Sequence, residues 1–253
     1  MIDIHSHILF GVDDGAKTIN ESMELIKEAI SKGVTHLILT PHFNKRNYSL
    51  KQDNVFVNYQ LLKEKTVLEN LNIHLFLGNE VYLTGSYSII SENGFYTLAD
   101  SNYILIEFNE IIPPDNIPEI CYEINVAGYI PIIAHAERYE IFHNNIKLLA
   151  EILNEGVHLQ VNASSVIKKE DNKRNKLAHF LLKNELISFV ASDVHNTTNR
   201  KFYLDKAYKE VCKHDACYGD KIFKQNQLNI IKNISFESPK PKLKQTFKNR
   251  FFK

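Results

Sequence analysis

The sequence has few cysteines and no long apolar run. Its 253 residues include three cysteines, Cys121, Cys212 and Cys217. An odd, sparse set argues against a disulfide framework and is typical of a reducing compartment. No apolar run approaches the roughly 20 residues of a membrane-spanning helix, and polar side chains from Asp3 onward leave no room for a signal peptide. We therefore expect a cytoplasmic protein.

The chain also lacks an excess of charge of either sign. Lys plus Arg and Asp plus Glu each number 30, so the formal net charge is zero. No overall field would attract nucleic acid or anionic lipid, and we expect no nucleic-acid partner. None of the cysteines is followed by an arginine six residues later, which excludes the phosphate-binding loop of the cysteine-dependent tyrosine phosphatases.

Short apolar runs alternate with longer amphipathic stretches along most of the chain. The runs are rich in Ile, Val and Leu, as expected for strands buried on both faces. We expect strands at residues 2–5, 34–40, 73–78, 103–108, 129–134, 157–162 and 186–192. Helices are expected at residues 19–32, 53–70, 116–127, 146–154, 172–183 and 200–213. This alternation predicts an α/β fold with a mainly parallel sheet.

Metal-ligand side chains follow almost every expected strand. The set comprises His5, His7, His42, Glu80, Glu107, His135, Asp193 and His195. His5 and His7 lie two residues apart, so in extended chain both side chains are on the same side. In a closed barrel of parallel strands all the carboxyl ends meet on one face, and this pattern favours a barrel over an open sheet.

Such a set is hard to explain as structural. A lone histidine near a strand end is usually structural, but eight ionisable groups packed together would repel or desolvate one another without a cation. The pattern therefore predicts a metal site, and mixed imidazole and carboxylate ligands suit Zn, Mn or Fe. We interpret the other six histidines as structural: His36, His74, His143, His158, His179 and His214.

Four further charged residues accompany the ligand candidates. Asp13 and Asp14 precede Gly15 in the loop after His7. Asp-Gly is ordinary turn chemistry, but one of the two carboxylates is also a candidate ligand. Arg138 and Arg200 closely follow ligand candidates, and each fits either a surface salt bridge or bidentate binding of phosphate.

The last residues differ in composition from the rest. From Ser235 onward the chain contains two prolines and is dense in lysine. We expect one barrel domain over residues 1–234 and a basic tail, solvated and partly disordered, over residues 235–253. Alternatively, this tail contacts an acidic partner or an anionic membrane surface, so that any membrane contact would be peripheral.

The motifs around these residues resemble a known superfamily. The His-x-His opening, Pro-His-Phe, Gly-Asn-Glu, His-Ala-Glu-Arg and Ser-Asp-Val-His resemble the PHP (polymerase and histidinol phosphatase) superfamily. The opening Met-Ile-Asp-Ile-His-Ser-His-Ile-Leu, followed by Gly-Val-Asp-Asp-Gly-Ala-Lys, is more specific. It resembles the bacterial tyrosine-protein phosphatases associated with capsular polysaccharide and exopolysaccharide. This resemblance covers nearly the whole chain and implies a distorted (β/α)7 TIM-like barrel.

The resemblance also implies three divalent metal ions, with Mn favoured and Fe or Zn as alternatives. It assigns His5, His7, Glu80 and Asp193 to the first ion, Glu107 and His135 with a bridging Glu80 to the second, and Asp14, His42 and His195 to the third. Arg138 and Arg200 match the arginines expected to grip the phosphate. Hydroxide activated by the metals would attack phosphorus, and a phenolate leaves readily because its pKa is about 10.

The implied substrate is a phosphotyrosine protein, namely the Tyr-rich tail of a bacterial tyrosine autokinase that controls polysaccharide export. Phe43, Tyr48 and Tyr82 follow ligand-bearing strands and are predicted to stack on the substrate ring. The resemblance also allows a homo-oligomer, although the sequence shows no interface signature.

Four other functions remain open. A histidinol phosphatase would have a similar metal site, but such enzymes tend to have His where this chain has Asp14 and Glu107. Amidohydrolases also open with His-x-His, but the Glu80 and Glu107 pair fits their usual pattern of metal ligands less well. A non-catalytic metal-binding scaffold is the third alternative, and a turnover assay would decide it. The fourth is nucleic-acid processing, which zero net charge disfavours.

Overall fold

A computed structural model describes residues 1–43, 52–84, 94–109, 113 and 116–241. The strands in this part of the chain are all parallel and form two ladders. The first ladder runs β1 (Ile2–Asp3), β2 (His36–Leu39), β4 (His74–Leu77). The second runs β3 (His42–Phe43), β5 (Glu80–Leu83), β6 (Tyr103–Phe108), β7 (Ile130–Ile133), β8 (His158–Asn162), β9 (Phe189–Ala191).

The two ladders are parts of one barrel. The chain passes from β2 into β3, and from β4 into β5, after two residues, so each pair is one interrupted strand. The ring closes where Ser6 bridges Val194 and the His7 N–H donates to the Val194 carbonyl at 2.9 Å. The described strands therefore make seven positions around the barrel, and the predicted TIM-like α/β barrel is confirmed.

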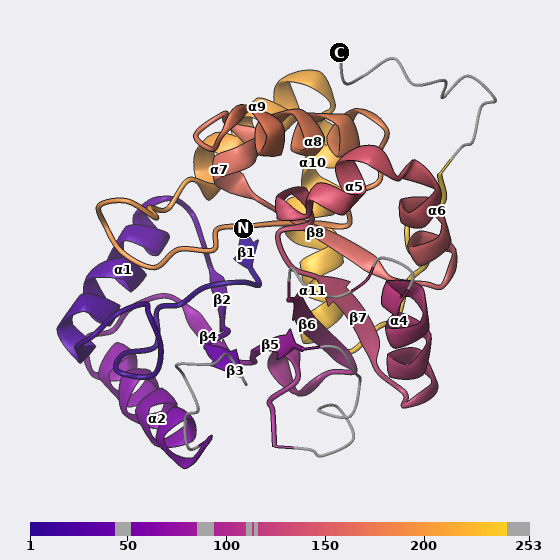
Figure 1. Cartoon of the computed structure of the whole chain (residues 1–253). Coiled ribbons are helices and arrows are strands. Elements are labelled where there is room, and N and C mark those ends of the chain that lie inside the picture. Colours follow the sequence, from indigo (N-terminus) through magenta and orange to yellow (C-terminus); the bar gives the residue numbers. More distant parts are fainter. Residues whose placement is uncertain (44–51, 85–93, 110–112, 114–115, 242–253) are drawn as a thin grey trace.

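Helices surround the strands (Figure 1). Those described are α1 (Ile19–Ser31), α2 (Gln52–Leu68), α4 (Asn116–Val126), α5 (Glu140–Asn144), α6 (Ile146–Asn154), α7 (Ala163–Val166), α8 (Asn172–Lys183), α9 (Leu204–His214), α10 (Ala216–Asp220) and α11 (Asn226–Ile231). A small apolar core that includes Ile4, Leu105 and Ile132 fills the barrel. Ile230 of α11 belongs to the same core, so α11 closes the amino-terminal end. No helix in the described ranges is long and apolar enough to cross a bilayer.

Most predicted elements agree with the structure within three residues, and α6 and α8 have the predicted bounds. The helix expected at residues 200–213 is an exception, because α9 begins at Leu204. The Asn196 side-chain oxygen accepts hydrogen bonds from the backbone N–H groups of residues 198–200. This turn keeps Arg200 in a loop at the carboxyl end of the barrel rather than in a helix.

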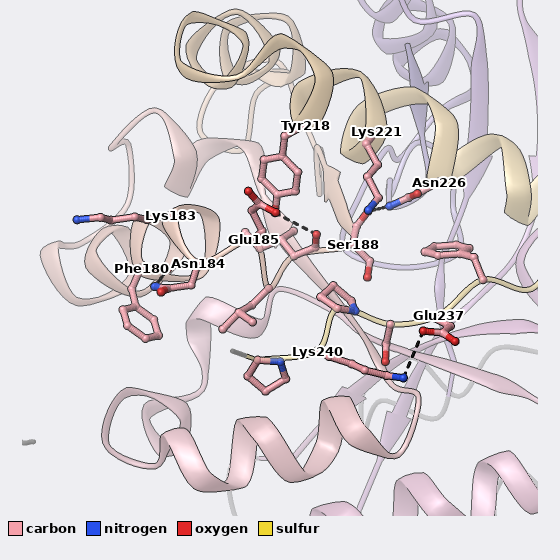
Figure 2. A pocket seen from close by; sticks show the side chains of 16 residues that line it. Phe180, Lys183, Asn184, Glu185, Ser188, Tyr218, Lys221, Asn226, Glu237 and Lys240 are labelled. Carbon is pink, nitrogen blue, oxygen red and sulfur yellow. Dashed lines mark hydrogen bonds and ion pairs between the residues drawn. The ribbon is translucent and has the colours of Figure 1, made fainter. Parts of the chain in front are cut away.

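Residues 235–241 pack against the amino-terminal end of the barrel. The Phe236 ring centroid lies 4.5 Å from that of His158, and Ser238 Oγ donates to the Leu153 carbonyl at 2.6 Å. This segment, Tyr218 and Ser188 border a cavity of about 520 Å³ (Figure 2), which lies away from the ligand-bearing strand ends because Ser188 precedes β9. Residues 242–253 lie outside the described ranges, so a separate tail over residues 235–253 stays a prediction.

Candidate metal centre

The structure brings all nine predicted ligands together at the carboxyl end of the barrel. In three overlapping groups, the candidate ligand atoms all lie within 4.8 Å of one another. The groups are His7, Asp14, His42 and His195; His5, His7 and Asp193; and His42, Glu80 and Glu107. His135 joins them through its Nε2, which lies 2.8 Å from Glu80 Oε1 and 3.8 Å from Glu107 Oε1.

His5 and His7 are oriented so that both present a basic nitrogen to the same point. His5 Nδ1 lies 3.0 Å from Gln160 Oε1, and His7 Nδ1 lies 2.6 Å from Asp13 Oδ2. Both partners are acceptors, so each Nδ1 carries a proton and each Nε2 of a neutral ring carries a lone pair. The two Nε2 atoms lie 3.2 Å apart. Two ring nitrogens at this distance share either a proton or a metal ion, and the carboxylates of Glu80 and Asp193 around them suit a metal ion.

Glu80 is the buried centre of the cluster. Its Oε2 lies 2.8 Å from His42 Nδ1 and 3.3 Å from His7 Nε2. Burial opposes its ionisation, but the neighbouring His5 and His42 outweigh burial and hold the pKa of Glu80 well below its usual range. Burial likewise opposes a charge on His5, yet Glu80 and Asp193 raise the pKa of His5 to about 9. The carboxylates thus demand compensating positive charge, which divalent cations supply.

Asp13 and Asp14 have different partners. Buried Asp13 accepts from the His7 ring, from the backbone N–H of His42 at 3.2 Å and from that of Gly15 at 2.9 Å. The Asp14 carboxylate is 38% exposed, and its Oδ1 lies 3.5 Å from His42 Nε2 and 3.4 Å from His195 Nε2. Asp13 therefore orients His7, whereas Asp14 faces two imidazoles as a metal ligand would.

Arg138 and Arg200 both contact Asp193. Arg138 Nη2 donates to Asp193 Oδ2 at 2.8 Å, and Arg200 Nη2 lies 2.7 Å from both carboxylate oxygens. Burial opposes ionisation of Asp193, but the two arginines outweigh burial and hold its pKa well below its usual range. Their side chains are 24% and 36% exposed, so both arginines remain partly accessible beside the cluster. Both arginines can therefore bind an anion that approaches the cluster.

Comparison with known proteins identifies the family. A model of the family described as capsular polysaccharide synthesis, CpsB/CapC, matches residues 1–232. The chain belongs to this family. The tyrosine-protein phosphatase CpsB of Streptococcus agalactiae is 33% identical over 240 residues, which are 92% of this chain and 99% of that protein.

Solved structures agree with the CpsB/CapC assignment. One match, from crystal structures of YwqE from Bacillus subtilis and CpsB from Streptococcus pneumoniae, described as unique metal-dependent tyrosine phosphatases, has a TM-score of 0.87 and 29% identity. It covers 95% of this chain and 98% of that one. A histidinol phosphate phosphatase from Lactococcus lactis, solved with Zn, histidinol and phosphate, has a TM-score of 0.55 and 16% identity. The match covers 84% of this chain and 94% of that one, and at this identity it shows the fold alone. The predicted family and its PHP-like barrel are confirmed.

Special backbone conformations position several of these residues in the CpsB/CapC chain. His135 and Asp193 have φ of 34° and 53°, in the left-handed region that only a few per cent of non-glycine residues adopt. Such conformations cluster at functional sites, where surrounding contacts hold them. Gly15 is required for another reason, because a Cβ there would lie 1.8 Å from the His7 carbonyl oxygen. The loop that carries Asp13 and Asp14 thus packs directly on the His7 backbone.

Sequence reasoning missed two positioning residues, Gln160 and Asn162 of β8. Gln160 Oε1 contacts His5 and accepts from the His135 N–H at 2.9 Å, while Asn162 Nδ2 donates to Asp193 at 2.8 Å. Both are buried and two residues apart in a strand that alternates polar and apolar residues. A polar stripe inside a fully buried strand was the signal that could have revealed them.

The aromatic residues predicted to stack on substrate are only partly described. Tyr48 lies outside the described ranges. Phe43 and Tyr82 are half-buried beside His42 and Glu80, and the Phe43 ring packs edge-on against Phe95 with centroids 6.0 Å apart. Their contact with a substrate ring stays a prediction.

Proposed function

We propose that this protein is a metal-dependent tyrosine-protein phosphatase that acts in capsular polysaccharide synthesis. The observation that carries the proposal is the buried cluster of imidazoles and carboxylates beside two arginines, in a chain of the CpsB/CapC family. A phosphate monoester is dianionic, so hydrolysis requires strong positive charge at the reacting group. Divalent ions held by the cluster, together with the two arginines, would supply that charge on one face of the barrel.

We propose the following ligand assignment for three divalent ions, with Mn preferred and Fe or Zn as alternatives. His5, His7, Glu80 and Asp193 hold the first ion, Glu80 with Glu107 and His135 the second, and Asp14, His42 and His195 the third. The short distances within each set support this assignment. Glu80 suits a bridging position because imidazoles contact both of its oxygens.

The chain's own residues hold and orient the reacting groups. Bound divalent ions would neutralise the phosphate and supply hydroxide near neutral pH. Asp13 and Gln160 fix the ring orientation of His7 and His5. Arg138 and Arg200 are the catalytic cations that steady the charge on the equatorial phosphate oxygens. Asn162 and the arginines hold Asp193 in place through its carboxylate.

The proposed substrate is a phosphotyrosine protein, and we further propose the tail of a bacterial tyrosine autokinase. Both arginines are accessible at the carboxyl end of the barrel, which suits a protein substrate that approaches from solvent. We propose a cytoplasmic location because the three cysteines are free, as expected in a reducing compartment.

The test is phosphatase activity of metal-stripped protein that is reloaded with Mn, Fe or Zn. A phosphotyrosine peptide and histidinol phosphate are the two substrates. We expect metal-dependent phosphate release from the peptide, with Mn most effective. Preference for histidinol phosphate would replace the proposal with a histidinol phosphatase. Metal binding without turnover of either substrate would favour a non-catalytic scaffold.

A further inference from the structure

A small cavity lies beside Asp193, next to the candidate metal centre. Its volume is about 90 Å³, and its lining includes Arg138, Arg200, Lys169 and Lys201. None of the histidines that surround Glu80 lines it. Because Arg138 and Arg200 are also the residues proposed to hold the phosphate, the cavity adjoins the phosphate position, and Lys169 and Lys201 add positive charge beside it.

The cavity carries an excess of positive charge. Its four cations face two carboxylates, Asp193 and Glu170. Glu170 is already engaged, because its Oε1 accepts from Ser164 Oγ at 2.9 Å and its Oε2 from Arg174 Nη1 at 3.1 Å. Asp193 is engaged by the two arginines. The charge that remains for a ligand is positive.

Lys169 and Lys201 are the unpaired members of this set. Both are exposed, and neither forms an ion pair within 4.0 Å with an acid of the described residues. Lys173, by contrast, contacts Glu140 at 2.8 Å on the neighbouring helix. Two exposed lysines that have no acidic partner in the described part of the chain, and that line the same cavity as two arginines, form a site for an anion.

The proposed phosphate position accounts for only part of this set of cations. Arg138 and Arg200 are the residues proposed to hold the phosphate, so Lys169 and Lys201 remain for a second anion. In a phosphotyrosine peptide at neutral pH, the other anionic side chains are the carboxylates of Asp and Glu. An acidic side chain is therefore the group that matches the two lysines in charge.

We propose that this cavity is a specificity subsite for an Asp or Glu next to the phosphotyrosine of the substrate. Lys169 and Lys201 are its specificity-determining residues. The inference rests on the proposed phosphatase function, since the phosphate must lie at the metal centre for the neighbouring side chain to reach the cavity. The protein then prefers phosphotyrosine sites in acidic sequence over neutral ones.

The test uses the full chain reloaded with Mn and two phosphotyrosine peptides that differ only in Glu or Gln beside the phosphotyrosine. We expect kcat/KM to be about threefold to tenfold higher for the Glu peptide, as two exposed charge contacts provide. This ratio should fall towards one in the variant Lys169→Gln/Lys201→Gln. The matched variant Lys176→Gln/Lys209→Gln removes two exposed lysines elsewhere and should keep the wild-type ratio.

Two results would overturn the subsite: equal kcat/KM for the two peptides in the wild type, or an undiminished ratio in Lys169→Gln/Lys201→Gln. Failure of the phosphatase proposal looks different, because neither peptide would be hydrolysed with any metal, and the subsite would fall with it. A preference that half-molar NaCl does not weaken would also contradict a contact between exposed charges.

Discussion

Two adjacent carboxylates in the β1–α1 loop have separate tasks at the site. The Asp13 carboxylate accepts hydrogen bonds from the His7 ring and from two backbone N–H groups, and it determines which nitrogen of His7 is protonated. Asp14 instead lies between His42 and His195. Because metal-binding histidines depend on such a hydrogen-bonded partner, the charge of Asp13 should affect metal affinity without any contact to the ion.

Replacing Asp13 with Asn tests this role. The amide oxygen can still accept from His7 but carries no charge, so the Nε2 of His7 becomes less basic. We expect Asp13→Asn to weaken metal binding by about tenfold to a hundredfold. Calorimetric titration of the metal-stripped protein with Mn measures this change.

The matched control for that variant is Glu24→Gln, which makes the same chemical change on the exposed face of α1. It should bind Mn as the wild type does. Circular dichroism would verify that both variants fold. Unchanged affinity in a folded Asp13→Asn protein would show that the charge of Asp13 does not tune His7.

At the scale of elements, the conformation of the β1–α1 loop depends on the close packing of Gly15 against the His7 backbone. Gly15 lies against the His7 backbone, and the Ala16 N–H donates to the His7 carbonyl at 3.1 Å. An added Cβ would overlap that carbonyl. The loop must therefore move if Gly15 changes, and it would carry Asp13 and Asp14 away from the imidazoles.

We expect Gly15→Ala to destabilise the protein by about 3 kcal/mol or more and to reduce its metal content. Gly33→Ala is the control, since Gly33 has φ of 81° with nothing within 4 Å of a new Cβ. It should cost only about 1–2 kcal/mol and leave the metal content unchanged. Thermal unfolding and elemental analysis of both variants measure these effects. Equal metal content in the two variants would contradict a role of Gly15 in placing the ligands.

The same elements explain what the sequence could predict. Eight of the ligand candidates were visible because each lies at or just after the end of an apolar run that forms a strand, whereas the residues alone left the choice between Asp13 and Asp14 open. The short strands β3 and β5 were missed, because they begin at His42 and Glu80, and polar residues just after a strand are expected to form a loop. The contacts of Gln160 and Asn162 depend on residues distant in the sequence, so no local pattern assigned them a partner.

At the scale of the whole molecule, the two ends of the barrel have opposite chemistry. The carboxyl end gathers charged ligands, whereas the amino-terminal end is closed by apolar and aromatic packing. His158 is a buried ionisable residue at that end, with Phe189 and Phe236 against its ring and Ser188 Oγ 2.8 Å from its Nδ1. A charged imidazole would be unfavourable there.

Burial lowers the pKa of His158 from 6.5 to about 4. The unfolded state therefore binds the extra proton first as pH falls, so the stability from a neutral His158 is present above about pH 6.5 and is lost towards pH 4. Between pH 7 and pH 4.5 the wild type should lose about 2.5 kcal/mol more unfolding free energy than His158→Gln, which does not titrate. His214→Gln, at a side chain that is 83% exposed, should retain the wild-type pH dependence. Urea unfolding of the metal-stripped proteins at both pH values measures this difference. An equal loss of unfolding free energy in the wild type and in His158→Gln would show that the fold does not hold His158 neutral.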